Sequence, residues 1–231
     1  MAYHTKLPIV TDGLVFSIDA YNTKSYVSGN TTTYDLTINK NNGTLQNGVG
    51  FDGTSWVFDG SDDYIDFGNP DVLNFGTNDF SVCVWFIRES NPTNNLRVFS
   101  KGAGTDLTLD PGFCLLGSDT DLKFLVNPTG VRAGANIPVV VNTPTFFVGT
   151  VNRLSSNIIT YKDGIFSNID NEGSPPLGAG TTSGPDSFWV GRNNNLSEYW
   201  DGGVYQIMIY NKVLTPSEVL QNYNALKHRF V

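Results

Sequence analysis

Hydrophobic and polar residues alternate in short runs along most of the chain, and turn-forming residues separate the runs about every ten residues. Representative runs are GLVFSIDA, SWVFDG, DFSVCVWFI, TFFVGTVN and GVYQIMIYN. A period of two places alternate side chains on opposite faces of a strand. Many short strands with almost no helical pattern predict an all-β protein, either an antiparallel sandwich or a barrel.

Two local patterns predict specific elements. The run NIITYK is followed by Asp163-Gly164 and then Ile165-Phe166, which predicts a hairpin with a two-residue turn. Near the end of the chain, Thr215-Pro216-Ser217-Glu218 forms a capping box with proline in the first helical position. An apolar stripe follows, so we expect one short terminal helix packed on the sheets; the stripe comprises Val219, Leu220, Tyr223 and Leu226.

The length of 231 residues suits one all-β domain with a sizeable core. We expect residues 1–11 to form an N-terminal arm or first strand, and residues 12–231 to form a single sandwich domain. The 24 glycines, 15 phenylalanines and 10 tyrosines agree with many strands joined by turns. Segments 90–95 and 171–187 have the composition of long loops.

The formal net charge of −8 argues against nucleic acid and anionic membranes as partners. No segment has the ~18 apolar residues that cross a bilayer, so we expect no membrane insertion. The N-terminus lacks the uninterrupted apolar stretch of a secretory signal, so we expect synthesis in a cytosol. Cys83 and Cys114 lie in strand-like runs and read as two buried free thiols, although a bridge between neighbouring strands stays open.

The stretch FDGSDDYIDFG places four aspartates within eleven residues, at positions 59, 62, 63 and 66. Its spacing does not fit the calcium loop D-x-[DN]-x-[DN]-G-x5-E. We interpret it as a tight hairpin-like connection whose carboxylates accept backbone N–H bonds. We therefore expect no metal and no cofactor. A calcium ion stays the alternative, since backbone carbonyls and waters can supply the remaining oxygen ligands.

Three blocks resemble a known family: TDGLVFSIDAYNTKSY, WVFDGSDDYIDFG and GVYQIMIYNKVLTPSEV. In this order they resemble the laminin-G-like, concanavalin A-like lectin/glucanase superfamily, over residues 12 to 226. The resemblance implies a two-sheet jelly-roll sandwich that binds glycans or proteins, sometimes with calcium. The opening block is especially similar to bacteriophage virion proteins.

Two departures from the family bear on chemistry. Many relatives have an acidic pair in the last strand, where this chain has Tyr205 and Gln206, which argues against a metal site there. Glucanase relatives carry Glu-x-Asp-x-Glu on one strand, and none of the four glutamates of this chain lies in such a motif. Only two histidines are present, each near a terminus. We therefore expect no catalytic residues and no enzymatic activity.

Sugar-binding surfaces combine exposed aromatic rings with polar hydrogen-bonding side chains. The loops 19–34 and 192–200 and the Asn-rich segment 91–95 have this composition, and their rings and amides either bind a ligand or anchor the loops. Relatives often have a tryptophan where this chain has Thr33. The four tryptophans lie in or beside strand-like runs and are expected in the core. The candidate ligand-binding residues are Tyr21, Tyr26, Tyr34, Asn193, Asn194, Asn195 and Tyr199.

We expect a virion surface protein, with other virion proteins, further copies of itself and host glycans as partners. In this interpretation it is a decoration, fibre or tail-associated subunit. The alternatives are a bacterial carbohydrate-binding lectin module and a glycan-cleaving enzyme. The opening AYHTKLPIV either contacts a neighbouring subunit or completes the domain's own sheet. Its candidate assembly contacts are Tyr3, His4, Leu7 and Ile9.

Overall fold

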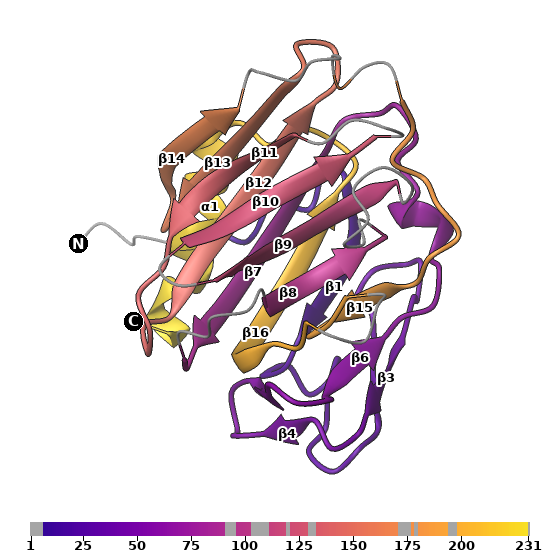
Figure 1. Cartoon of the computed structure of the whole chain (residues 1–231). Coiled ribbons are helices and arrows are strands. Elements are labelled where there is room, and N and C mark those ends of the chain that lie inside the picture. The colour runs from indigo at the N-terminus through magenta and orange to yellow at the C-terminus, as the bar shows by residue number, and fades with distance from the viewer. Residues whose placement is uncertain are drawn as a thin grey trace, which may run out of the picture.

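The computed structural model describes residues 7–90, 96–102, 111–118, 121–128, 133–170, 177, 180–193 and 198–230. Within these residues the chain forms two eight-stranded antiparallel sheets that face each other (Figure 1). This confirms the predicted two-sheet sandwich. None of the helices among the described residues has the length and apolar character needed to cross a membrane.

Sheet A contains the first and last long strands of the chain. Its order is β14-β13-β12-β7-β16-β5-β4, with β1 paired to β16. Its strands are β1 (Leu14–Asp19), β4 (Gly50–Phe51), β5 (Trp56–Asp59), β7 (Phe80–Arg88), β12 (Thr145–Asn152), β13 (Asn157–Lys162), β14 (Ile165–Asp170) and β16 (Asp201–Tyr210).

Sheet B has the order β11-β10-β9-β8-β15-β6-β3-β2. Its strands are β2 (Thr32–Thr33), β3 (Gly43–Gln46), β6 (Tyr64–Asp66), β8 (Leu96–Lys101), β9 (Gly112–Ser118), β10 (Asp121–Asn127), β11 (Ala133–Pro138) and β15 (Phe188–Val190). Single-turn helices cover Asp71–Leu73 (η1) and Lys227–Arg229 (η3), and α1 spans Pro216–Leu226.

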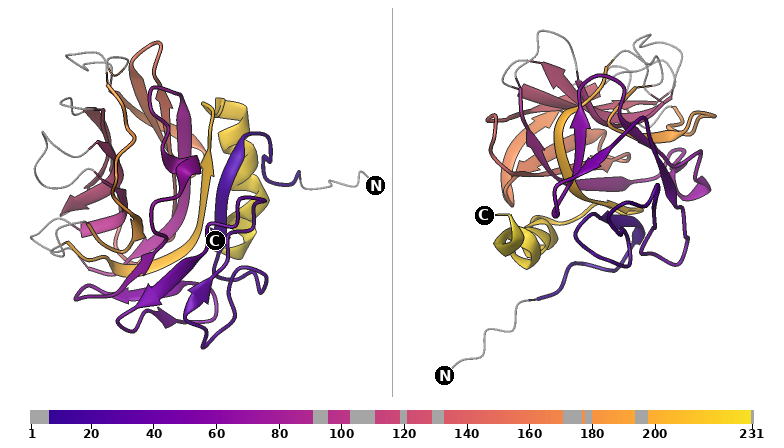
Figure 2. Two further views of the ribbon diagram at one scale, coloured as in Figure 1. Left: turned by 90° about the vertical axis from the view of Figure 1, so that its right-hand side faces the viewer. Right: turned by 90° about the horizontal axis from the view of Figure 1, so that it is seen from below.

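Alternation along the central strands separates two apolar layers. In β7, Val82, Val84 and Phe86 point into the core between the sheets, whereas Cys83 and Trp85 belong to a second cluster on the outer face of sheet A. α1 lies against this outer face (Figure 2, left). The predicted strand period therefore holds, and both faces of sheet A are covered.

The predicted local elements at 163–166 and 215–226 are confirmed. Asp163 and Gly164 adopt φ angles of 52° and 81°, and they connect β13 to β14 as the hairpin turn. The Thr215 hydroxyl accepts from the Glu218 N–H, and the Glu218 carboxylate accepts from the Thr215 N–H, which completes the capping box of α1. All four tryptophans are buried, as expected.

The connection FDGSDDYIDFG differs from the expected hairpin. Asp59 ends β5 in sheet A, and Tyr64 begins β6 in sheet B, so the chain crosses from one sheet to the other. The expected turn bonding is nevertheless present. The Asp59 carboxylate accepts from the Ser61 N–H at 2.8 Å, and the Asp63 carboxylate accepts from the Asp59 N–H at 3.2 Å. Such local bonds fix the bend but do not decide which sheet receives the next strand.

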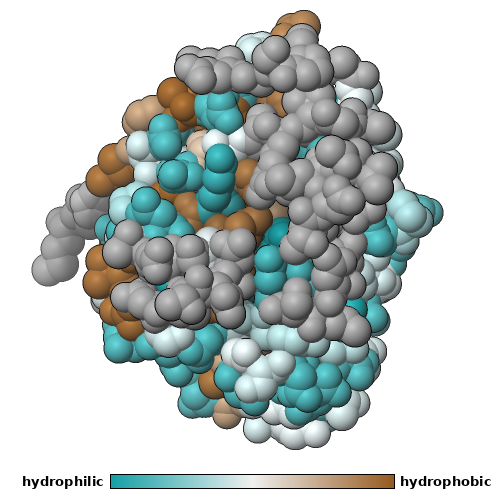
Figure 3. Space-filling view, viewed as in Figure 1, coloured by the Kyte–Doolittle hydropathy of each residue, from teal (hydrophilic) through white to brown (hydrophobic). Residues whose placement is uncertain are grey.

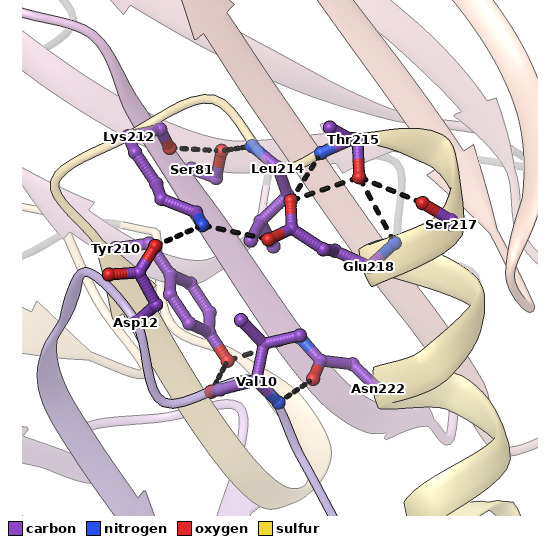
Figure 4. A network of polar contacts seen from close by, with 10 residues as sticks. All are labelled: Val10, Asp12, Ser81, Tyr210, Lys212, Leu214, Thr215, Ser217, Glu218 and Asn222. Carbon is purple, nitrogen blue, oxygen red and sulfur yellow. Dashed lines mark hydrogen bonds and ion pairs between the residues drawn. The ribbon is translucent and has the colours of Figure 1, made fainter. Parts of the chain in front are cut away.

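Residues 7–11 form no strand, and β1 begins at Leu14. The Val10 N–H donates to the Asn222 side chain of α1 at 2.8 Å, and the Tyr210 hydroxyl donates to the Val10 carbonyl at 3.0 Å (Figure 4). Lys212 bridges Asp12 at 2.6 Å and Glu218 at 2.7 Å in the same network. These bonds fasten the start of the domain to its own helix and to β16.

Candidate functional site

The three candidate tyrosines that follow β1 lie in different environments. Tyr21 is 59% exposed and Tyr34 is 44% exposed, so both rings reach the surface. Tyr26 is only 4% exposed, and its ring packs edge-on against Phe51 and Trp56. The expectation of an exposed ring at Tyr26 is wrong, because this side chain fills a gap in the core and its hydroxyl donates to the Asn30 carbonyl.

Asp19, the last residue of β1, organises the backbone around Tyr21. Its buried carboxylate accepts from the Tyr21 N–H at 3.1 Å. It also accepts two hydrogen bonds from the Arg229 guanidinium, at 2.7 and 2.8 Å. Such a two-pronged pair is geometrically specific. It joins the first strand to the C-terminal η3, although 210 positions separate the two residues.

The Tyr21 pocket is a hollow of about 380 Å³, lined by Tyr21, Thr54, His228, Arg229 and Phe230. The Arg229 guanidinium lies 5.2 Å from the centre of the Tyr21 ring and 4.8 Å from that of Phe230. Because the ion pair with Asp19 holds Arg229, the pocket has a fixed wall. It combines an exposed aromatic ring with hydroxyl, imidazole and guanidinium groups, the make-up of a small-molecule site.

Two further candidate residues, Asn193 and Tyr199, lie between β15 and β16. Asn193 is fully buried and Tyr199 is half-buried. Asn194 and Asn195 lie outside the described residues, as do Tyr3 and His4. None of the described members of this loop lines the Tyr21 pocket.

Next to this loop, the outer face of sheet B holds buried charged side chains that the sequence pattern did not reveal. The Arg97 Nε donates to the Glu198 carboxylate at 2.5 Å, and both residues are buried. Burial acts to lower the pKa of Arg97, whereas the adjacent Cys114 and Glu198 raise it by more. The Arg192 guanidinium lies 4.0 Å from the centre of the Tyr64 ring and 4.6 Å from that of Trp189.

Figure 3 views the molecule from the side of sheet B. Hydrophilic residues predominate on the lower part of this face, and apolar residues gather along the edge where β14 lies. The exposed apolar residues of β14 are Ile165, Phe166 and Ile169. A bulge interrupts the pairing of β13 with β14, as is common in edge strands that avoid pairing with other chains.

Carboxylate oxygens of Asp59, Asp62 and Asp63 lie within 4.8 Å of one another. Burial, together with the charges of Asp59 and Asp62, raises the pKa of the Asp63 carboxyl. The Asp59 and Asp63 carboxylates accept from backbone N–H groups of their own turn, so the bend brings these carboxylates together. The expectation of a protein without metal or cofactor stays a prediction.

The candidate assembly residues Leu7 and Ile9 flank Pro8, whose carbonyl accepts from the Gln221 side chain of α1 at 2.8 Å. Leu7 is 65% exposed, and Ile9 packs partly against the outer cluster of sheet A. This part of the segment thus lies on the domain's own helix. Contact with a neighbouring subunit stays a prediction.

Solved structures with the same fold include binding domains and a sialidase. The receptor-binding domain of botulinum neurotoxin D has a TM-score of 0.65 and 12% identity, over 92% of this chain and 52% of that chain. The binding domain of Paraclostridial Mosquitocidal Protein 1 has a TM-score of 0.66 and 17% identity, over 92% of this chain and 52% of that chain. Trypanosoma rangeli sialidase in complex with sialic acid has a TM-score of 0.69 and 13% identity, over 95% and 34%.

The chain thus spans about half the length of the two binding domains and about a third of the sialidase. At these identities the likeness shows the fold alone. A search of curated protein sequences finds no match. A family model described as the concanavalin A-like lectin/glucanases superfamily matches residues 59–220. The chain belongs to the concanavalin A-like lectin/glucanases superfamily.

Proposed function

We propose that this protein binds carbohydrate, without cleaving it, through the Tyr21 pocket. The observation that carries the proposal is the exposed Tyr21 ring, held in a pocket of about 380 Å³ beside polar groups of Thr54, His228 and Arg229. This volume falls within the ~300–1,000 Å³ of small-molecule sites. A rigid ring offers the C–H face of a sugar a flat apolar surface, and the polar groups meet its hydroxyls.

Charge and geometry in the pocket agree with a ligand that is polar but carries no net charge. Arg229 is already paired with Asp19, so its positive charge is balanced where the ligand would sit. Hydroxyl groups donate and accept hydrogen bonds, as sugar recognition by Thr54 and His228 requires. Membership of a lectin-containing superfamily and the likeness to binding domains support the proposal by analogy.

Replacing Tyr21 tests the proposal. Purified protein is screened on a glycan array and on whole bacterial cells, with calcium and then with chelator. The Tyr21→Ala variant is expected to weaken binding about tenfold or more, because the stacking surface is lost. Tyr34→Ala is the matched control, since Tyr34 is also an exposed tyrosine of segment 19–34 but lines no part of the pocket.

If Tyr34→Ala or Tyr199→Ala weakens binding while Tyr21→Ala leaves it unchanged, the binding site lies outside the Tyr21 pocket. Binding that disappears in chelator would reveal a cation-dependent lectin and contradict the metal-free site. Absence of binding to every glycan and cell tested would reject the carbohydrate-binding function.

The biological setting that we propose is the surface of a bacteriophage particle, with other virion proteins or further copies of this chain as partners. It is supported by the resemblance of the opening block TDGLVFSIDAYNTKSY to phage virion proteins. Deletion of residues 2–7 retains the Val10 bonds to Asn222 and Tyr210, so the fold is expected to survive. Unchanged incorporation of this deletion variant into particles would argue against an assembly role for Leu7, Tyr3 and His4.

A further inference from the structure

A larger groove adjoins the Tyr21 pocket. We call it the β1 groove; its volume is about 690 Å³. Its walls come from three segments that are far apart in sequence: residues 7–11, residues 36–38 and the end of α1 with η3. The early part of the chain and the C-terminal helix lie side by side in both views of Figure 2. The floor of the groove consists of β1 and β16, through Ser17, Asp19 and Gln206.

The Asp19–Arg229 ion pair separates the β1 groove from the Tyr21 pocket. Asp19 lines the groove, Arg229 lines the pocket, and their side chains bond at 2.7 and 2.8 Å. His228 lines both hollows. The two hollows therefore meet at this ion pair, and a ligand long enough to pass over it could occupy both.

Gln206 supplies an independent sign of a ligand in the groove. The residue is 3% exposed, and its Oε1 has no hydrogen-bond partner within the described residues. A buried acceptor without a donor is costly, so it calls for an explanation. Gln206 stands opposite Asp19 in the β1–β16 register, on the floor of the groove. A ligand hydroxyl that donates to this oxygen would satisfy it.

The rim of the groove alternates apolar and polar groups. Ile38 is 91% exposed and Leu7 is 65% exposed, while Asn22 and Thr37 stand among them. A purely apolar ligand would leave the polar groups of this lining without water or partners. A sugar ring has apolar C–H faces and polar hydroxyl edges, so it matches both kinds of neighbour.

We propose that the β1 groove continues the Tyr21 pocket and that the ligand is an oligosaccharide. One sugar stacks on Tyr21, and the following units cross the Asp19–Arg229 pair into the groove, where a hydroxyl donates to Gln206 Oε1. This inference rests on the proposed function and adds the length and direction of the ligand.

Calorimetric titration with glucose, N-acetylglucosamine and their di- to hexasaccharides tests the inference. The unchanged protein is expected to bind the longer members at least about tenfold more tightly than the single sugar. Gln206→Met removes the unpaired acceptor without opening a large cavity, and Ile38→Ala trims an exposed side chain, so both variants are expected to fold. Each should lose about tenfold in affinity for the longest saccharide and nothing for the shortest.

Two variants separate this inference from the proposed function. Tyr21→Ala should weaken binding of short and long saccharides alike, and Leu154→Ala, which changes a 97% exposed residue outside both hollows, should change neither.

If affinity does not rise with length, or if Gln206→Met and Ile38→Ala bind long saccharides as the unchanged protein does, the groove is not part of the site. Tyr21-dependent binding of the short sugar would then still support the proposed function. If no member of either series binds, both proposals fail for these sugars, and the glycan array decides whether the function survives.

Discussion

The outer faces of the two sheets are covered by different chemistry. On sheet A, Trp85 stacks on Tyr223 of α1 at 5.7 Å and contacts Phe230 at 4.7 Å between ring centres. On sheet B, the buried cations of the outer face include Arg97, which is paired with Glu198, and Arg192, whose guanidinium lies over the Tyr64 and Trp189 rings. One face is an apolar contact with a helix, and the other holds cations buried against a carboxylate or against aromatic rings.

The difference teaches how each face depends on its partners. Apolar contacts are non-directional and scale with the area removed from water, so several neighbours share the stabilisation of sheet A. Buried charges need specific partners at short distances, because an unpaired buried charge is far more costly than an exposed one. Single replacements should therefore weaken sheet A by loss of packing and sheet B by leaving a charge without its partner.

The largest expected effect is on sheet A. Trp85→Ala removes the ring that α1, Phe146 and Phe230 contact, and should lower the free energy of unfolding by about 3–5 kcal/mol. Urea denaturation followed by circular dichroism measures the loss. Leu154→Ala, a change of an exposed side chain, is expected to stay within about 0.5 kcal/mol of the unchanged protein. If the two changes lower the free energy of unfolding equally, the apolar cluster on the outer face of sheet A does not contribute to stability as proposed.

On sheet B, Glu198→Ala leaves the buried Arg97 guanidinium without its carboxylate. Removal of one partner of a buried pair costs about 3–5 kcal/mol, and the value here should lie near the lower limit because Glu198 keeps slight exposure. The double variant Arg97→Met with Glu198→Leu should recover most of this loss, since no charge remains unpaired. Denaturation of the single and double variants measures the coupling. Additive losses in the double variant would show that packing, and not charge pairing, stabilises this face.

The sequence predicts much of the fold because its main signals are local. Strand alternation, the Asp163-Gly164 turn and the Thr215–Glu218 capping box each act within a few residues, and each appears in the structure. The crossing between β5 and β6 does not follow from such signals. The aspartates of this stretch specify a bend, and the sheet that receives Tyr64 depends on its pairing with β3 and β15.

The candidate site could be predicted only in part. Tyr21 stands out as an exposed ring after a strand, but the same composition suggested Tyr26, whose burial is decided by its contacts with Phe51 and Trp56. His228 and Arg229 complete the Tyr21 pocket from the other end of the chain. The Arg97–Glu198 pair likewise joins residues separated by 101 positions, so neither partner signals the other.

The two cysteines lie on opposite outer faces, Cys83 in the cluster under α1 and Cys114 beside Leu116 and Leu125 on sheet B. Both are buried, and burial raises the pKa of the Cys83 thiol. A thiol-labelling reagent therefore reacts with either cysteine only when the layer that covers it opens. Each face thus contains its own chemical reporter. The labelling rate of one thiol records how often the helix lifts from sheet A, and that of the other records how often the charged layer of sheet B gives way.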